Sequence, residues 1–541
     1  MKKTFLAITA LSAMLFAGCT SSDELTTLES VKNADNTPTP VQFGTYMSKT
    51  GTTRAGTAGT IAATTSSSFK SAEYVLDEKG GFGVFAYYTG GTDYAVATTV
   101  TPNFMYNQKV EKNASSGDGT TEGTKFEVTT WKYDPIKYWP NEFAAGDVDT
   151  QNPDAQGATS NGKVTFFAYA PQISTPSNGN PAANLTGKNN NATVDIDKTK
   201  VQTTSDATGI TAMTMNNFEG HPYLQYKLAS LVDMSSNVDL LWGTAGTNGV
   251  NAATNAAQNG STLYDLDGEG YTVNTNLVKM KTTDANRVAF NFKHALALVG
   301  GYDATAGYGM TIQLDADEDI VSKTIGGESK PVTKVMVESI TITNDWNATD
   351  GIQAEENISQ GGVFNLATGE WNLDAATAPA KFTQTIDVAG TTDAKLNTDI
   401  AWSNPTMTTQ SDVETYFKST TETGVIEASK KNVFASDDYK TPLVYLPGTT
   451  PKLKFTIVYR VLTYDAGLAA WCTNVQQTIS RVVTFPNPVK LNKRYNINII
   501  LGLTSVKFTA TVADWDRDVN NSGAVDTSDD TVVNLPANVA P

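Results

Sequence analysis

An acidic segment near the C-terminus has the spacing of a calcium-binding loop. Between residues 518 and 529, oxygen-bearing side chains occupy loop positions 1, 3, 5, 9 and 12, and a glycine stands at position 6, where such loops turn sharply. The last ligand is an aspartate instead of the longer glutamate, and no helical pattern flanks the segment, so a solvated acidic linker is the alternative interpretation. Apart from this candidate Ca²⁺ site, the sequence offers no cofactor motif. The five candidate ligands are Asp518, Asn520, Ser522, Asp526 and Asp529.

Arg54 offers a second kind of chemistry, that of a proteolytic processing site. It stands before Ala55 in a stretch rich in Gly, Thr and Ala that contains almost nothing able to pack. A trypsin-like, Arg-specific protease needs such an accessible, extended backbone with arginine before the cut. Cleavage there would detach residues 41–47, in which apolar and polar side chains alternate as in a strand with one buried face. An ordinary edge strand followed by an ordinary loop is the alternative.

Cys19 is a candidate lipidation site. Residues 1–18 combine two N-terminal lysines with an apolar run too short to span a bilayer comfortably, which indicates a signal peptide. The run ends in Leu-Phe-Ala-Gly before Cys19, a pattern that resembles the bacterial lipobox. We therefore expect an acylated Cys19 to anchor the mature chain to the outer membrane, with residues 19–38 as a polar tether; an ordinary secretory signal is the alternative.

The sequence shows little of the residue pattern that hydrolytic catalysis needs. Acid–base and nucleophilic mechanisms need a convergent nucleophile, base and orienting group, and the chain has two histidines, His221 and His294. His294 lies in an apolar run, where a hydrogen-bonded core histidine is the expected role. The sequence therefore predicts a protein that is not an enzyme.

Composition and charge favour an all-β protein. The 541 residues carry a formal net charge of -17, which would repel nucleic acid, so no nucleic-acid partner is expected. Hydrophobic residues make up 40% of the chain, as in folded proteins, and short apolar runs separated by turn residues recur without long helical periods. This spacing is typical of β-sandwiches.

The chain divides into two expected β-sandwich domains. The first covers residues 39–245 and begins with the removable strand, and the second covers residues 285–515. Between them, residues 246–284 include a low-complexity stretch that predicts a boundary loop. Residues 516–541 form an acidic C-terminal tail.

Several short motifs, in this order, resemble the fimbrillins of Bacteroidetes type V pili. The resemblance covers most of the chain after the signal peptide, and each motif alone is weak. Besides Cys19 and Arg54, the motifs are residues 41–43, 82–86 (Phe-Gly-Val-Phe-Ala), 138–140 (Tyr-Trp-Pro), 164–171, 238–242, 292–296 (Phe-Lys-His-Ala-Leu) and 501–506, with Trp515.

The resemblance implies two tandem transthyretin-like β-sandwich domains and export as a lipoprotein precursor to the cell surface. It further implies cleavage after Arg54 and polymerisation with other pilus subunits by strand exchange, in which the C-terminal tail of a neighbour is the donor strand. Here the tail's alternation is short and Pro536 interrupts it. A pilus tip or accessory adhesin, and a monomeric surface lipoprotein that binds glycan or a host ligand, therefore remain alternatives to a stalk subunit.

Overall fold

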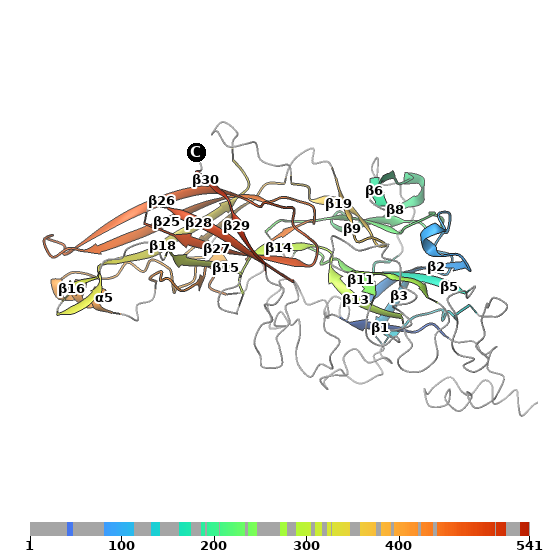
Figure 1. Ribbon diagram of the computed structural model, residues 1–541, viewed down its shortest axis with the longest axis horizontal. Helices are drawn as coiled ribbons and strands as arrows, with labels where there is room; N and C mark the ends of the chain where they lie inside the picture. Colours follow the sequence, from blue (N-terminus) through green and yellow to red (C-terminus); the bar gives the residue numbers. More distant parts are fainter. Residues whose placement is uncertain are drawn as a thin grey trace, which may run out of the picture.

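Strands dominate this computed structural model (Figure 1), which confirms the all-β prediction. The described residues include one α-helix, α5 (Gln410–Lys418), and two short 3₁₀ helices, η2 (Tyr94–Val96) and η3 (Lys198–Lys200). No helix in this part of the chain is long and apolar enough to cross a membrane. The structure describes residues 40–46, 81–112, 131–140, 162–174, 186–189, 192–204, 206–232, 236–245, 271–277, 288–303, 309–315, 322–325, 327–346, 358–374, 380–390, 394–419, 424–436, 441–503, 505–514 and 531–539.

The first pair of sheets consists of an eight-stranded and a five-stranded sheet. In the larger sheet the spatial order is β1 (Phe43–Tyr46), β13 (Val288–His294), β11 (Leu241–Ala245), β5 (Lys163–Ala170), β2 (Phe82–Gly90), β3 (Met105–Lys112) and β4 (Trp131–Lys132), and β12 (Asn274–Leu277) also pairs with β5. In the smaller sheet the order is β20 (Trp371–Leu373), β19 (Gly361–Asn365), β10 (Tyr223–Lys227), β9 (Gly209–Thr214) and β8 (Val201–Thr203).

The eight-stranded sheet is buried on both faces. Along β2, Phe85 and Tyr87 join the core that is shared with the five-stranded sheet, whereas Phe82 and Val84 join a separate core on the opposite face. Successive strand side chains point to opposite faces, so a sheet covered on both sides needs nearly continuous apolar strands. This explains the uninterrupted apolar runs that the sequence shows in β2 and β5.

The second pair of sheets is built mainly from the C-terminal half, at the other end of the molecule (Figure 1). Phe455 and Phe508 pack across the interface of the two sheets, with ring centroids 4.9 Å apart. The seven-stranded sheet has the order β23 (Lys431–Asn432), β15 (Met310–Leu314), β27 (Lys493–Leu501), β14 (Ala297–Gly300) and β24 (Pro442–Tyr445), and β28 (Val506–Asp514) joins β27 to β29 (Thr531–Leu535). The six-stranded sheet has the order β22 (Ala394–Lys395), β21 (Thr383–Asp387), β18 (Thr333–Thr343), β25 (Lys452–Tyr464), β26 (Cys472–Thr484) and β30 (Ala537–Val539).

The remaining elements include a helix and two hairpins. The helix α5 begins with a capping box, in which Asp412 N donates to Thr409 Oγ1 at 3.2 Å and Thr409 N donates to Asp412 Oδ2 at 2.8 Å. Two separate hairpins are β6 (Thr186–Asn189) with β7 (Ala192–Asp195), and β16 (Ser322–Ile325) with β17 (Glu328–Pro331).

Strands β27 and β28 form an antiparallel pair along their whole length, and Gly502 N donates to Ser505 O at 2.8 Å between them.

Strand pairing differs from the expected domain boundaries. Strand β13 lies in the expected second domain but pairs with β11 of the first sheet, because its alternating phenylalanines fit that sheet's buried faces. Strand β12 lies inside the expected boundary loop 246–284 and pairs with β5. Strands β19 and β20 also come from the second half and complete the five-stranded sheet. The division between sheets therefore does not fall at residue 245 or 285, and the number of domains stays a prediction.

The two pairs of sheets meet where β13 passes into β14. There, Ala295 N donates to Leu240 O at 2.7 Å, and Trp371 Nε1 donates to Ala295 O at 2.8 Å. Beside them, His294 Nδ1 lies 2.9 Å from Asp239 Oδ2, and the two side chains are only 2% and 5% exposed. His294 is thus a hydrogen-bonded core histidine, as the sequence predicts.

Asp239→Ala should lower the free energy of unfolding by about 3–5 kcal/mol, because it removes the carboxylate of a buried pair from beside the His294 imidazole. Asp345→Ala is the matched control. Asp345 pairs with Lys381 at 2.6 Å, but both side chains are about half exposed, so its loss should cost about 0–1 kcal/mol. Urea denaturation of the two variants and the wild type measures both values. Equal destabilisation of Asp239→Ala and Asp345→Ala would show that the buried pair of His294 and Asp239 stabilises the fold no more than the exposed pair of Lys381 and Asp345.

Candidate assembly site around the first strand

The first strand, β1, is held on both flanks by backbone hydrogen bonds. It runs parallel to β13 at the edge of the eight-stranded sheet, and Val288 N donates to Gln42 O at 2.9 Å. On the other flank, Val41 N donates to Lys137 O at 2.8 Å, and Tyr133 Oη donates to Val41 O at 2.7 Å. The segment is therefore fixed between β13 and residues 131–140.

Phe43 anchors this strand in an aromatic cluster. Its ring centroid lies 6.0 Å from that of Phe290 in a stacked arrangement and 5.3 Å from that of Tyr133 at an edge. The rings of Phe82 and Phe166 both approach it edge-on at 6.1 Å. Burial of one such side chain contributes about 1.5–3 kcal/mol, and each aromatic pair adds about 0.5–1.5 kcal/mol. Phe43, which is 2% exposed, thus anchors β1 in this core.

Removal of β1 would open a strand-shaped groove. Phe82, Phe166 and Phe290 line the place that Phe43 fills, and all three are fully buried while it is there. The edge of β13 that now pairs with β1 would become free, since its other edge pairs with β11. An apolar groove beside an unpaired strand edge is a surface on which another strand can pair.

The expected burial pattern of the first strand is confirmed where it is described. Val41 and Phe43 are buried, whereas the intervening Gln42 is half-buried. No partner for this strand is predicted from the sequence, although Phe290 and Phe292 of β13 alternate as in a strand with one face suited to an aromatic cluster.

The C-terminal tail is paired with its own subunit. Strand β29 lies antiparallel to β28, with Leu535 opposite Phe508. Leu535 is 4% exposed, whereas Val532 on the other face is 68% exposed. Strand β30 lies antiparallel to β26, in the other sheet of the pair. The tail therefore connects the edges of two sheets.

Pro536 separates these two strands, as the sequence predicts. Strand β29 ends at Leu535 and β30 begins at Ala537, and Thr484 N donates to Pro536 O at 3.3 Å. A proline has no N–H for a ladder, so it suits the point where the chain passes from one sheet to the next.

Three predicted sites lie outside the described residues and stay predictions. They are the lipidation site Cys19, the processing site Arg54 and Ala55, and the calcium loop with Asp518, Asn520, Ser522, Asp526 and Asp529. Within the described ranges, no group of three or more His, Cys, Asp or Glu side chains is placed to hold a metal ion.

His221, the second histidine, lies away from β1, in the loop before β10. It is almost fully buried, and burial lowers the pKa of its imidazole from 6.5 to about 4. The ring is therefore neutral at pH 7, and it packs edge-on against Tyr94 with centroids 5.7 Å apart.

Comparison with known proteins finds a fimbrial protein that is similar to one part of this chain. Over 116 residues the chain is 30% identical to the fimbrium subunit Fim1C of Phocaeicola vulgatus. This similarity supports the resemblance to Bacteroidetes fimbrillins over those residues. The matched region is 21% of this chain and 22% of Fim1C, so the chain spans about a fifth of the length of this relative.

Two further comparisons concern family models and solved structures. No family model matches the chain. A crystal structure of a fimbrial protein from Bacteroides vulgatus aligns over 88% of this chain and 99% of its own, with 15% sequence identity and a TM-score of 0.44. This TM-score is low, so the likeness bears neither on the fold nor on the function of this protein.

Phe43→Ala should loosen β1, because deletion of a buried Phe side chain costs about 3–5 kcal/mol. Hydrogen exchange of the Val288 amide, which donates to Gln42 O, reports on the loss directly. We expect much faster exchange in Phe43→Ala and little change in Gln42→Ala, which removes only a half-buried side chain. Unchanged exchange in Phe43→Ala would show that the aromatic cluster does not hold the strand.

His221 should make stability depend on pH between 6.5 and about 4. In that window the unfolded chain binds a proton at this residue and the folded chain does not, so its contribution is present above pH 6.5 and is lost as the pH falls. The full shift corresponds to roughly 3 kcal/mol. Urea denaturation at pH 7 and pH 4 should show a larger loss for the wild type than for His221→Gln. Equal losses of stability in the wild type and in His221→Gln would contradict the assignment of this pH dependence to His221.

Proposed function

We propose that this chain is a structural subunit of a cell-surface fimbrium that supports adhesion and has no catalytic role. In this proposal the precursor is exported, lipidated at Cys19 and anchored in the outer membrane. An Arg-specific protease then cuts after Arg54, and the subunit polymerises with other pilus subunits by strand exchange. The relationship to Fim1C supports a fimbrial role.

One observation supports the mechanism: β1 is an edge strand, and its Phe43 side chain fills an aromatic groove. While β1 remains attached, its effective local concentration is on the order of millimolar, well above that of a donor strand from another subunit. Cleavage after Arg54 would remove this advantage. An incoming strand that places an apolar side chain beside Phe290 and pairs with β13 could then replace β1.

The C-terminal tail is the proposed donor. Leu535 is the one buried side chain among residues 531–536, so release of β29 from β28 would expose little apolar surface. Val532, already 68% exposed, would supply a further apolar side chain to an acceptor groove. In such a donor, β29 and β30 would leave the edges of their own sheets.

The pairing of the tail with its own subunit also favours a second candidate. A tip or accessory adhesin, or a monomeric surface lipoprotein that binds glycan or a host ligand, would keep β29 on β28 and β30 on β26. Such a protein would accept a strand without donating one, or would keep β1.

Treatment of the mature protein with an Arg-specific protease tests the proposal. We expect a single early cut after Arg54, followed by polymers in negative-stain electron microscopy. Arg54→Ala should stay an uncut, folded monomer, because β1 then cannot leave. Truncation before Thr531 should allow the cut and remove the donor, so that no polymers form.

Arg54→Lys is the matched control, since it keeps the positive charge but is not a substrate of an Arg-specific enzyme. Trypsin should cut it and restore polymers. Normal polymers of uncut Arg54→Ala would refute removal of β1. Polymers of the truncated chain would refute the tail as donor, and a cut wild type that stays monomeric would favour the second candidate.

A further inference from the structure

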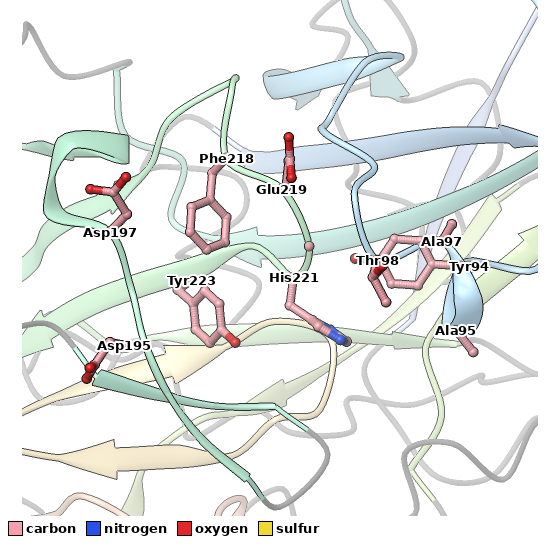
Figure 2. A pocket seen from close by; sticks show the side chains of 11 residues that line it. Tyr94, Ala95, Ala97, Thr98, Asp195, Asp197, Phe218, Glu219, His221 and Tyr223 are labelled. Carbon is pink, nitrogen blue, oxygen red and sulfur yellow. The ribbon is translucent and has the colours of Figure 1, made fainter.

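A cavity of about 310 Å³ opens at one end of the first pair of sheets (Figure 2). It lies between η2, which follows β2, and the turn that joins β9 to β10. Tyr94 belongs to the core on the face of the eight-stranded sheet opposite to Phe43, so this pocket is separate from the groove of β1. Its lining includes Tyr94, Phe218, Tyr223, Asp195, Asp197 and Glu219.

Aromatic rings form the inner part of the pocket. The rings of Phe218 and Tyr223 meet edge-on with centroids 5.9 Å apart, and Tyr223 is buried. The backbone positions this wall, because Gly220 N donates to Val100 O at 2.9 Å and Tyr94 N donates to Asn276 Oδ1 at 2.8 Å. The pocket is thus built from elements that are tied to the folded core.

Three acidic residues line the same pocket. Figure 2 shows Phe218 between Asp197 and Glu219, with Asp195 on the side of Asp197, and all three acidic residues are exposed. Two hydrogen bonds from Thr199 hold the pKa of the Asp197 carboxyl below its usual range. Among the described residues, no lysine or arginine lines the pocket. The opening is therefore negatively charged at neutral pH.

We propose that this pocket binds an organic cation, namely an ammonium or guanidinium group on a carbon stem. The carboxylates at the opening attract the charged group, and the half-buried ring of Phe218 supplies apolar surface and cation–π contact. A neutral sugar would instead need a broad exposed ring face, which the buried rings of Tyr94 and Tyr223 do not offer.

The same cation chemistry has two sources. One is a free polyamine, and the other is a basic side chain on an exposed segment of a protein partner. In either case binding is independent of cleavage and polymerisation, so it is measured on the uncut chain and its outcome does not depend on the fate of β1.

Isothermal titration calorimetry of the uncut mature chain tests the proposal. The probes are acetyl-Gly-Arg-Gly-amide, its citrulline analogue, which has the same shape without the charge, and spermidine. We expect the arginine peptide or spermidine to bind, and the citrulline peptide to bind at least about tenfold more weakly, because it lacks the charge that the carboxylates attract. Tighter binding of the peptide assigns the site to protein side chains, and tighter binding of spermidine assigns it to free amines.

Variants locate the binding. The double variant Asp195→Asn, Glu219→Gln should weaken cation binding by about tenfold, because it removes two of the three negative charges that line the pocket. Asp399→Asn is the matched control, since it removes an exposed carboxylate outside the pocket and should leave binding unchanged. Circular dichroism checks that the variants fold.

Three results would overturn the proposal. They are no detectable binding of either cation, equal binding of the arginine and citrulline peptides, and equal weakening by Asp399→Asn and the pocket double variant. Binding of a neutral oligosaccharide that the arginine peptide does not displace would assign the pocket to glycan instead.

Discussion

The continuous segment formed by β13 and β14 is the constraint on which the rest of the structure depends. Strand β13 pairs with β11 and β1 in the first sheet, and β14 pairs with β24 and β27 in the second pair of sheets. The chain crosses between them at Ala295 and Leu296, which are fully buried. Ala295 N donates to Leu240 O, and Leu296 O accepts from Asn492 N at 3.0 Å. Both pairs of sheets also share one hydrophobic core cluster. A change at this crossing therefore affects both ends of the molecule.

The two buried faces of the eight-stranded sheet have different roles. One face packs against the five-stranded sheet through large side chains such as Trp242, whose indole nitrogen donates to Leu366 O at 2.8 Å. The other face is covered by short segments, β1 and residues 131–140, that wrap around it. The interface with the five-stranded sheet therefore lies on the face opposite to β1.

The aromatic surroundings of β1 and the pocket beside η2 differ in charge. The groove of β1 is aromatic, which suits exchange of one strand for another of similar shape. The pocket beside η2 combines aromatic rings with carboxylates on a chain whose net charge is -17, which suits a small positively charged group. The first pair of sheets thus carries two surfaces of different chemistry, the contact surface of β1 and the pocket between η2 and the β9–β10 turn.

Local pattern alone determined the strands, their buried faces and several turns. Phe82–Gly90, Lys163–Ala170 and the β27–β28 hairpin follow from apolar runs and turn residues, because those signals act between near neighbours. The tertiary structure decided which edges meet. Pairing of β1 with β13 joins residues more than two hundred positions apart, and β19 reaches back to β10, with β20 on its other edge. Such pairing depends on which sheet edge remains open after all other strands have packed, and this is a property of the whole fold.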